Sequence, residues 1–246
     1  MEIQYILDGK IGFVPASDLE LYRFNSLLEK EPETIEWVRR WSQVKPILLD
    51  IGANIGIYSL FAAITHPSSQ VFSFEPVLNN FQSLVNNICA NPGISVHPFN
   101  IAISDKCHIS DLFISDLRPG NSGAQLEKPV NDKGESFSAL KTEKVLAFSL
   151  DRLISDYGFP RPNYIKIDVD GLETLILRGM EKSLADKSLK SVLVELNNQL
   201  DLDLWTNTMK KHGLQLDHSL DSLPNHSDIR RKLKGNAARN YIFSRD

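Results

Sequence analysis

The feature that most constrains this chain is an apolar run that ends in a glycine-containing turn. Residues 47–51 read Ile-Leu-Leu-Asp-Ile, which is apolar except for Asp50, as in a strand buried on both faces of a parallel sheet. The turn 52–56 follows, and residues 57–64 then indicate an amphipathic helix. A strand that passes through a tight turn directly into a helix predicts an open α/β sheet.

The rest of the chain continues this alternation of strands and helices. Further strands are expected at residues 71–74, within residues 95–103, and at residues 164–169 and 192–196. Helices are expected at residues 79–90, 150–157, 172–184 and 202–211. The last segments, 214–218 and 241–243, alternate in polarity and predict an antiparallel hairpin. The predicted fold class is therefore α/β, a doubly wound, mostly parallel, Rossmann-like sheet with a C-terminal antiparallel hairpin.

Two segments depart from this pattern. Residues 1–36 are expected to form an N-terminal helical extension, and residues 37–246 the Rossmann-like domain. Within the domain, residues 116–138 are rich in Gly, Asn, Pro, Ser and Lys. An irregular stretch of this length is usually a functional loop or an insertion, so we expect a variable loop that forms a mobile lid over a ligand pocket.

Composition excludes some function classes. The formal net charge of −4 gives no general attraction to nucleic acid, and the basic run 230–234 is expected to be a solvated face. No run of about 18 apolar residues predicts a membrane-spanning helix, and the first residues lack the pattern of a signal peptide. Cys89 and Cys107 have no metal-ligand spacing and are expected to be free, buried thiols. These features predict a cytoplasmic protein with no nucleic-acid and no membrane partner.

The spacing of the turn argues for a cationic ligand. It reads Asp-x-Gly-x-Asn-x-Gly and not the Gly-x-Gly-x-x-Gly of dinucleotide sites. Asp50, at the end of the strand, would repel a pyrophosphate and attract a cation. S-adenosylmethionine carries a sulfonium and an ammonium group, so it suits this position. By itself the turn also fits an ordinary strand–turn–helix corner.

Acidic residues follow the later strands as well. Glu75, after the strand 71–74, is placed to accept hydrogen bonds from both hydroxyls of a ribose. Asp168 and Asp170 lie at the end of the strand 164–169. The ligand crevice of an open α/β sheet lies outside the carboxyl ends of its strands, and buried charges are costly unless they are paired or used.

Glu195 ends the following strand and is expected at the same edge of the sheet. Lys166 interrupts the buried strand that carries Asp168. A structural ion pair of Lys166 with Asp168 or with Glu195 remains an alternative to a functional role. Glu75 could likewise be a solvated residue at a strand end.

Taken together, these motifs resemble a known family. DIGANIGIYSL, FEP and IKIDVDGLETLILRG, in this order and spacing, are similar to the FkbM-type S-adenosylmethionine-dependent methyltransferases, which have a class I, Rossmann-like fold. NSGAQL, SLDRLI, VLVEL and NYIFSR extend the resemblance to roughly residues 33–246. Asp170 stands where the family often has Glu. The resemblance implies O-methylation of a hydroxyl on a sugar or a secondary-metabolite-like small molecule.

The resemblance also implies roles for single residues. It places the methionine part of the donor on a loop formed by Asp50, Gly52, Asn54 and Gly56. It places the ribose on Glu75, and the adenine near Asn100, Ala102, Ser104 and Asp105. The general base would be Asp168, with Asp170, Glu195 and His97 as further candidates. A divalent metal on the three acids of this set is compatible with the sequence but not required.

Two other functions stay open from the sequence. The chain could be a non-catalytic small-molecule-binding module on the same fold. A nicotinamide-dependent oxidoreductase is disfavoured because the dinucleotide glycine spacing is missing. The sequence defines neither the acceptor nor the oligomeric state.

Overall fold

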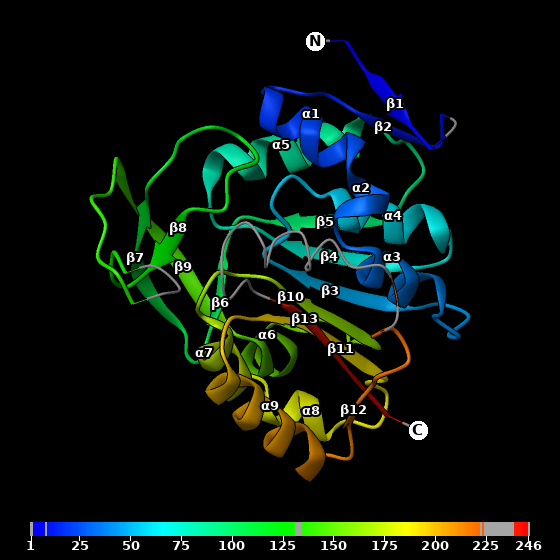
Figure 1. The fold of residues 1–246 in the computed structure, drawn as a ribbon, viewed down its shortest axis with the longest axis vertical. Helices are drawn as coiled ribbons and strands as arrows, with labels where there is room; N and C mark the ends of the chain where they lie inside the picture. Colours follow the sequence, from blue (N-terminus) through cyan, green and yellow to red (C-terminus); the bar gives the residue numbers. More distant parts are fainter. Residues whose placement is uncertain (1, 8, 131–133, 222, 224–238, 246) are drawn as a thin grey trace.

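The core of the protein is a seven-stranded sheet, seen in a computed structural model that describes residues 2–7, 9–130, 134–221, 223 and 239–245 (Figure 1). Its strand order is β12-β13-β11-β10-β3-β4-β5. The strands are β3 (Ile47–Ile51), β4 (Gln70–Phe74), β5 (Val96–Phe99), β10 (Tyr164–Ile167), β11 (Ser191–Leu196), β12 (Gln215–Leu216) and β13 (Arg239–Ser244).

Strand direction confirms the predicted fold class. The strands from β5 to β11 are parallel, whereas β13 is antiparallel to β11 and β12 is antiparallel to β13. Apart from β5, the parallel strands are buried along most of their length, which is why they appear in the sequence as apolar runs. In the register of the sheet, Asp50 of β3 lies between Ser73 of β4 and Lys166 of β10.

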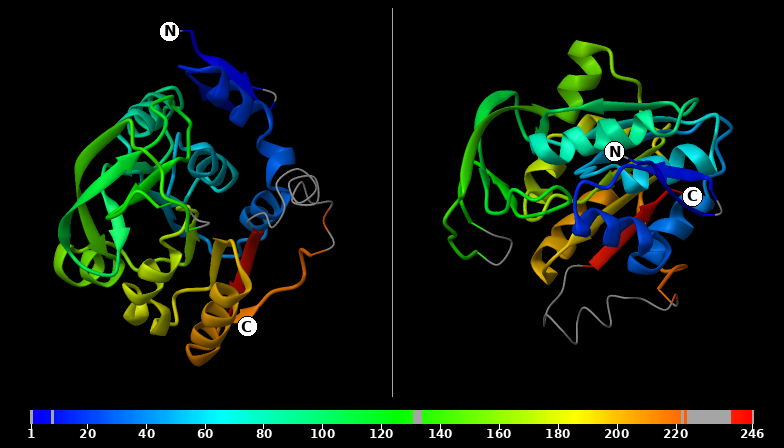
Figure 2. Two further views of the ribbon diagram at one scale, coloured as in Figure 1. Left: turned by 60° about the vertical axis from the view of Figure 1, so that its left-hand side comes forward. Right: turned by 90° about the horizontal axis from the view of Figure 1, so that it is seen from above.

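Helices cover both faces of the sheet (Figures 1 and 2). One face packs against α3 (Pro32–Arg39) and α4 (Ile57–Thr65), with α5 (Leu78–Cys89) beside β5. The other face packs against α6 (Leu150–Tyr157), α7 (Glu173–Arg178), α8 (Glu181–Ala185) and α9 (Gln199–Lys211). This two-sided cover makes the fold doubly wound.

The N-terminal region contains strands that the sequence analysis does not predict. An antiparallel pair, β1 (Gln4–Ile6) and β2 (Ile11–Phe13), precedes α1 (Asp18–Asn25) and α2 (Leu27–Lys30). The boundary expected between residues 36 and 37 falls inside α3. The region packs on the domain, because the side chain of Asn91 bonds both backbone groups of Gly12 and the indole of Trp37 donates to Ser191.

A second, four-stranded sheet stands beside the first, in the order β6-β9-β7-β8. Its strands are β6 (Ala102–Ser104), β7 (His108–Ile114), β8 (Ala124–Leu126) and β9 (Lys141–Ser149). The segment 95–103 contains the expected strand as β5, but β6 begins within the same segment and belongs to a different sheet. The side-chain amide of Asn100 donates to the carbonyls of Glu75 (2.8 Å) and Pro76 (3.0 Å) and holds the chain where it leaves β5.

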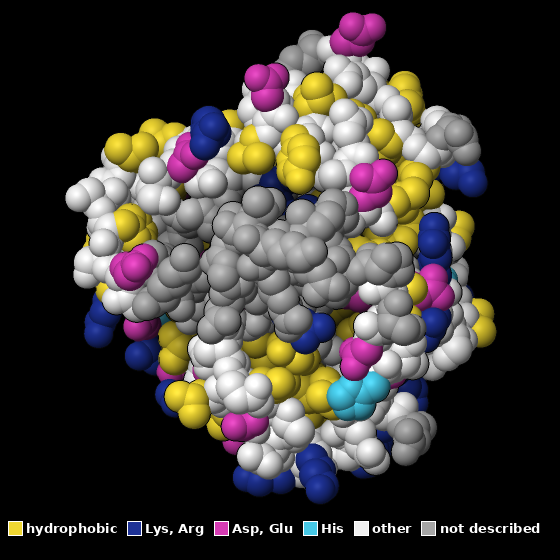
Figure 3. Space-filling view, in the orientation of Figure 1, with side chains coloured by type: hydrophobic (Ala, Val, Ile, Leu, Met, Phe, Trp, Pro, Cys, Tyr) yellow, Lys and Arg dark blue, Asp and Glu magenta, His cyan; other side chains and the backbone are white. Residues whose placement is uncertain are grey.

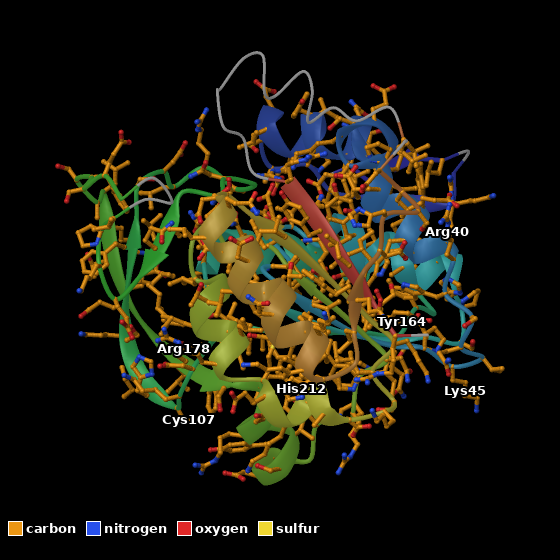
Figure 4. All side chains as sticks on the ribbon, turned by 60° about the horizontal axis from the view of Figure 1, so that its bottom comes forward. Arg40, Lys45, Cys107, Tyr164, Arg178 and His212 are labelled. Atoms are coloured by element: carbon orange, nitrogen blue, oxygen red, sulfur yellow. The ribbon has the colours of Figure 1, made fainter. Side chains whose placement is uncertain are left out.

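Two of the expectations from composition, on the thiols and on membrane-spanning helices, can be compared with the structure. Cys89 and Cys107 are free but exposed, so the expectation of buried thiols is wrong; Figure 4 shows Cys107 beside the small sheet. None of the described helices is long and apolar enough to cross a membrane. Acidic and basic side chains are interspersed on the face shown in Figure 3, and the basic run 230–234 lies outside the described residues.

Candidate functional site

A cavity opens at the carboxyl ends of β3, β4 and β10, and its empty volume, open mouth included, is about 610 Å³. The chain runs from β3 outward to β4 and β5, and later returns to β10 on the other side of β3, so the strand order reverses here. The polar part of the wall includes Asn54, Glu75, Asn80, Asn121, Asp168 and Asp170. The apolar part includes Val77, Ile101, Ala102, Leu112, Leu126 and Leu172.

Gly52 and Gly56 shape the turn that follows β3. Both have positive φ angles, +80° and +85°. A Cβ atom on Gly52 would lie 1.9 Å from the carbonyl oxygen of Asp168, so this glycine lets the ends of β3 and β10 touch. A Cβ atom on Gly56 would lie 2.4 Å from the side chain of Leu84 on α5. Gly52 lines the cavity, whereas Gly56 supports it through helix packing.

Glu75 comes directly after β4 and is 4% exposed. Its Oε2 atom accepts a hydrogen bond from the backbone N–H of Asn54 at 2.8 Å, and Oε1 accepts one from the backbone N–H of Val77 at 2.9 Å. Burial raises the pKa of Glu75 to about 7 and outweighs these hydrogen bonds, which favour the charged form. The pKa of this carboxyl group therefore lies near neutral pH.

Asp50 lies inside the protein and not on the described wall of the cavity. It is 1% exposed, accepts a hydrogen bond from the Ser59 hydroxyl at 2.5 Å and lies 3.8 Å from the ammonium of Lys166. Burial raises its pKa, although Lys166 and Ser59 favour the charged form. The structure thus places Asp50 behind the turn, where it does not line the space open to a ligand.

Asp168 lines the cavity, and Lys166 holds it from behind. The Lys166 ammonium lies 3.0 Å from Asp168 Oδ2; the lysine side chain is 2% exposed and that of Asp168 is 27% exposed. Burial opposes ionisation of Asp168, but Lys166 and Lys30 hold its pKa well below the usual range. The sequence left open an ion pair of Lys166 with Asp168 or with Glu195, and the structure contains the pair with Asp168. Glu195 also hydrogen-bonds with Asp168, although Glu195 does not itself line the described cavity.

The turn after β10 carries Asp170 and is fastened from two sides. Asp170 lines the cavity with a positive φ of 55°, and its carbonyl accepts a hydrogen bond from the Gln125 side chain of β8 at 2.5 Å. Glu173, which the sequence analysis does not single out, accepts the N–H of Gly171 at 3.0 Å. Burial raises the pKa of Glu173 to about 7, against that hydrogen bond. An acid at the start of a largely apolar helix was the signal in the sequence.

The residues expected near the adenine are only partly at the cavity. Ala102 lines it, between Ile101 and Ile103. Ser104 and Asp105 are not in the described lining, because they pack behind it on Gly179, where a Cβ would lie 2.2 Å from the Ser104 carbonyl.

Asn100 and His97 do not line the described cavity either. Asn100 holds the chain at the end of β5, through the hydrogen bonds to the carbonyls of Glu75 and Pro76. His97 lies on β5 with its ring beside Phe72, at a centroid distance of 4.9 Å. The candidate general bases at the cavity are therefore Asp168 and Asp170, with Glu195 behind Asp168.

Two asparagines that the sequence analysis missed, Asn80 and Asn121, complete the polar wall together with the predicted Asn54. The side-chain amides of Asn54 and Asn80 both donate to the carbonyl of Asn121, at 3.0 Å and 2.9 Å. Asn80 also accepts the N–H of Gly120 at 2.8 Å. Within the described ranges, no three His, Cys, Asp or Glu side chains are grouped so as to hold a metal ion, and the divalent ion compatible with the sequence has no support.

Comparison with known families identifies one model that covers most of the chain. The model described as "Methyltransferase FkbM domain" matches residues 50–243. The match begins at Asp50 and ends in β13, so it contains the turn, Glu75 and the β10 end of the cavity. The N-terminal strands and α1 to α3 lie outside it.

Curated relatives carry the same chemistry in their names. The hexuronic acid methyltransferase AglP of Haloferax volcanii is 29% identical over 189 residues, which are 77% of this chain and 71% of AglP. The 31-O-demethyl-FK506 methyltransferase FkbM of Streptomyces tacrolimicus is 25% identical over 173 residues, 59% of this chain and 64% of that protein. The chain thus spans slightly less than two thirds of the second relative.

Solved structures share the fold. The methyltransferase FkbM of Methylobacillus flagellatus superposes with a TM-score of 0.52 at 16% identity, over 93% of this chain and 55% of the other. A precorrin-6y C5,15-methyltransferase of Geobacter metallireducens gives a TM-score of 0.50 at 13% identity, over 99% and 100% of the two chains. At these identities the likeness concerns the fold alone.

Proposed function

The chain belongs to the FkbM methyltransferase family, and on this premise we propose that it transfers a methyl group from S-adenosylmethionine to a hydroxyl group of a small molecule. The acceptor class that we propose is a sugar or a secondary-metabolite-like compound. The names of two relatives support it, since one is a hexuronic acid methyltransferase and the other a 31-O-demethyl-FK506 methyltransferase.

The observation that carries the donor assignment is the carboxyl group of Glu75 at the strand end beside the glycine turn. Each of its oxygens accepts one backbone N–H, and a carboxylate oxygen has lone pairs for a second donor. Two neighbouring ribose hydroxyls supply such a pair of donors. The apolar wall around Ala102 and Leu126 suits a flat base.

The charge of the cavity wall favours S-adenosylmethionine over a dinucleotide as the ligand. The described lining contains the carboxyl residues Glu75, Asp168 and Asp170 and no Lys or Arg. A pyrophosphate would meet like charge there, whereas the sulfonium and ammonium of S-adenosylmethionine would meet opposite charge. This argues against the nicotinamide-dependent oxidoreductase. The turn is also not a simple strand–turn–helix corner, because it faces an open cavity.

S-adenosylmethionine, when bound, supplies an electrophilic methyl group on sulfur. The acceptor oxygen forms a bond to the methyl carbon, the carbon–sulfur bond breaks with its electron pair going to sulfur, and the hydroxyl proton leaves. The protein therefore has to align the two molecules and accept one proton.

Asp168 is our candidate for the group that accepts this proton. The ion pair with Lys166 keeps its carboxylate charged across the physiological pH range. A low pKa makes Asp168 a weak base toward a free hydroxyl. Once the new oxygen–carbon bond begins to form, however, the hydroxyl proton becomes strongly acidic, and even a weakly basic carboxylate can accept it. Asp170 and Glu195 are the second candidates, because the first lines the cavity and the second bonds with Asp168.

Incubation with methyl-labelled S-adenosylmethionine and a panel of sugars and hydroxylated metabolites tests the proposal. We expect label on an acceptor oxygen and an equal amount of S-adenosylhomocysteine, and calorimetry should show binding of S-adenosylhomocysteine but not of NAD. Binding without turnover of any acceptor would favour the non-catalytic binding module. Tight binding of NAD alone would contradict the donor assignment.

A further inference from the structure

The chain segment 117–121, here called the bridge segment, connects parts of the cavity that are distant in sequence. Its last carbonyl, of Asn121, accepts the side-chain amides of Asn54 (3.0 Å) and Asn80 (2.9 Å). Asn54 belongs to the turn after β3, and Asn80 to α5. One backbone oxygen thus fixes two side chains of the cavity wall.

The same segment is held from outside by α1. The Arg23 side chain donates its Nε–H to the carbonyl of Gly120 at 2.5 Å, and the Ser17 hydroxyl donates to the carbonyl of Pro119 at 2.9 Å. A Cβ on Gly120 would lie 3.1 Å from the side chain of Glu20, so α1 also touches the segment directly. Helix α1 itself contributes no residue to the described lining of the cavity.

These contacts form a continuous path from α1 to the donor site. Arg23 bonds the carbonyl of Gly120, the next residue along the chain is Asn121, and its carbonyl bonds the Asn54 side chain. The backbone N–H of Asn54 in turn donates to Glu75 Oε2 at 2.8 Å. Every step is a hydrogen bond or a peptide unit.

We propose that Arg23 is a positioning residue for the donor site, and that α1 acts on catalysis through the bridge segment. Residues 18–25 lie outside the matched family region 50–243, so this role belongs to the N-terminal part of this chain. The inference rests on the proposed function, because Glu75 and Asn54 are taken as donor-binding groups. It also gives this part of the expected variable loop a different role, as a wall fastened to α1 and α5.

Three arginine variants test the proposal. Arg23→Ala removes the hydrogen bond. Arg23→Gln keeps a donor, because the Gln amide nitrogen is as many bonds from the backbone as Arg Nε, and loses the charge. Arg40→Ala is the matched control, since Arg40 follows the last residue of α3, pairs with Glu36 and Ser219, and lies away from the small sheet in Figure 4.

Two readouts are needed, the affinity for S-adenosylhomocysteine by calorimetry and amide hydrogen exchange of the free protein. We expect Arg23→Ala to weaken binding about tenfold, near the loss of one charge-assisted hydrogen bond, and to speed exchange at Gly120 and Asn54. Arg23→Gln should restore most of the affinity and most of the protection from exchange, and Arg40→Ala should match wild type in both. Thermal unfolding of each variant separates these local effects from general destabilisation.

The inference is overturned if Arg23→Ala binds and exchanges like Arg40→Ala while wild type binds normally. If wild type does not bind S-adenosylhomocysteine, the proposed function fails, and exchange alone decides the inference. Faster exchange at Asn54 in Arg23→Ala then still supports the path from α1, and unchanged exchange rejects it.

Discussion

Two carboxyl groups at opposite sides of the cavity are built in opposite ways. Glu75 is buried with backbone N–H donors as its main partners, and burial raises its pKa to about 7. Asp168 faces the same cavity, but the buried ammonium of Lys166 at 3.0 Å overcomes burial and lowers its pKa. Near neutral pH the first group gains charge when further donors reach it, whereas the second is charged before any ligand arrives.

This difference suggests that the two carboxyl groups have different roles. Hydrogen-bond donors on a ligand would stabilise the ionised form of Glu75, so its charge is coupled to donor binding. The charge of Asp168 is fixed by the fold, as a group that receives a proton late in the reaction requires. Variants that remove one charge at a time can break or sharpen this comparison.

The largest effect is expected at Asp168. Asp168→Asn keeps the shape and removes the charge, so the single-turnover rate of methyl transfer should fall by about 10²–10⁴-fold. Donor affinity should change much less, because the donor's ribose is held at the other side. Both quantities are measured on one variant, by rapid quench and by calorimetry. A normal rate at saturating donor would show that Asp168 only pairs with Lys166.

The turn that separates the two groups should be the next most sensitive. Gly52→Ala combines a positive φ with a clash against the Asp168 backbone, and we expect it to lower the free energy of unfolding by about 3 kcal/mol or more. In Gly56→Ala the clashing neighbour is the flexible end of Leu84, so the loss should be about 1–2 kcal/mol. Urea denaturation compares them; equal losses would contradict the contact between β3 and β10.

The central sheet could be predicted because its information is local. The parallel strands other than β5 are buried along most of their length and appear as apolar runs, and acids after β4 and β10 mark the ligand edge. The break between β5 and β6 could not be predicted in this way. It depends on the Asn100 side chain, whose carbonyl partner at Glu75 is 25 residues away. The strands β1 and β2 have three residues each, too few for a clear alternation.

Prediction of the site from the sequence has the same limit, because contacts between distant elements cannot be read from local patterns. Glu75, Asp168 and Asp170 could be placed at the cavity from their position after strands. The inward direction of Asp50 could not, because it depends on Ser59 and Lys166, which come from two other elements. The role of Asn121 as a shared acceptor requires the folded path of a segment whose composition looks like a loop.

The raised pKa values should make the free energy of unfolding depend on pH. Glu75 and Glu173 bind their protons more tightly in the folded protein, with pKa values of about 7 against 4.5 for the ordinary group. Their contribution to stability is therefore fully present below about pH 4.5 and is lost as pH rises through 7. Deprotonation of each group over that range lowers the free energy of unfolding by up to about 3 kcal/mol. Glu75→Gln and Glu173→Gln should each flatten the pH profile of the unfolding free energy; profiles parallel to wild type would contradict this.

The most direct test of the account is calorimetric titration of S-adenosylhomocysteine into wild type, Glu75→Gln and Glu173→Gln. Glu173 has a similar raised pKa but does not line the described cavity, so it is the matched control. At about pH 8, where Glu75 is ionised, Glu75→Gln should bind about 10–100-fold more weakly than wild type, as expected for a hydrogen bond to a charged group. At about pH 6 the gap should shrink, because wild-type Glu75 is then protonated, and Glu173→Gln should follow wild type at both values. Equal affinity of wild type and Glu75→Gln at about pH 8 would contradict the assignment of this cavity as the donor site.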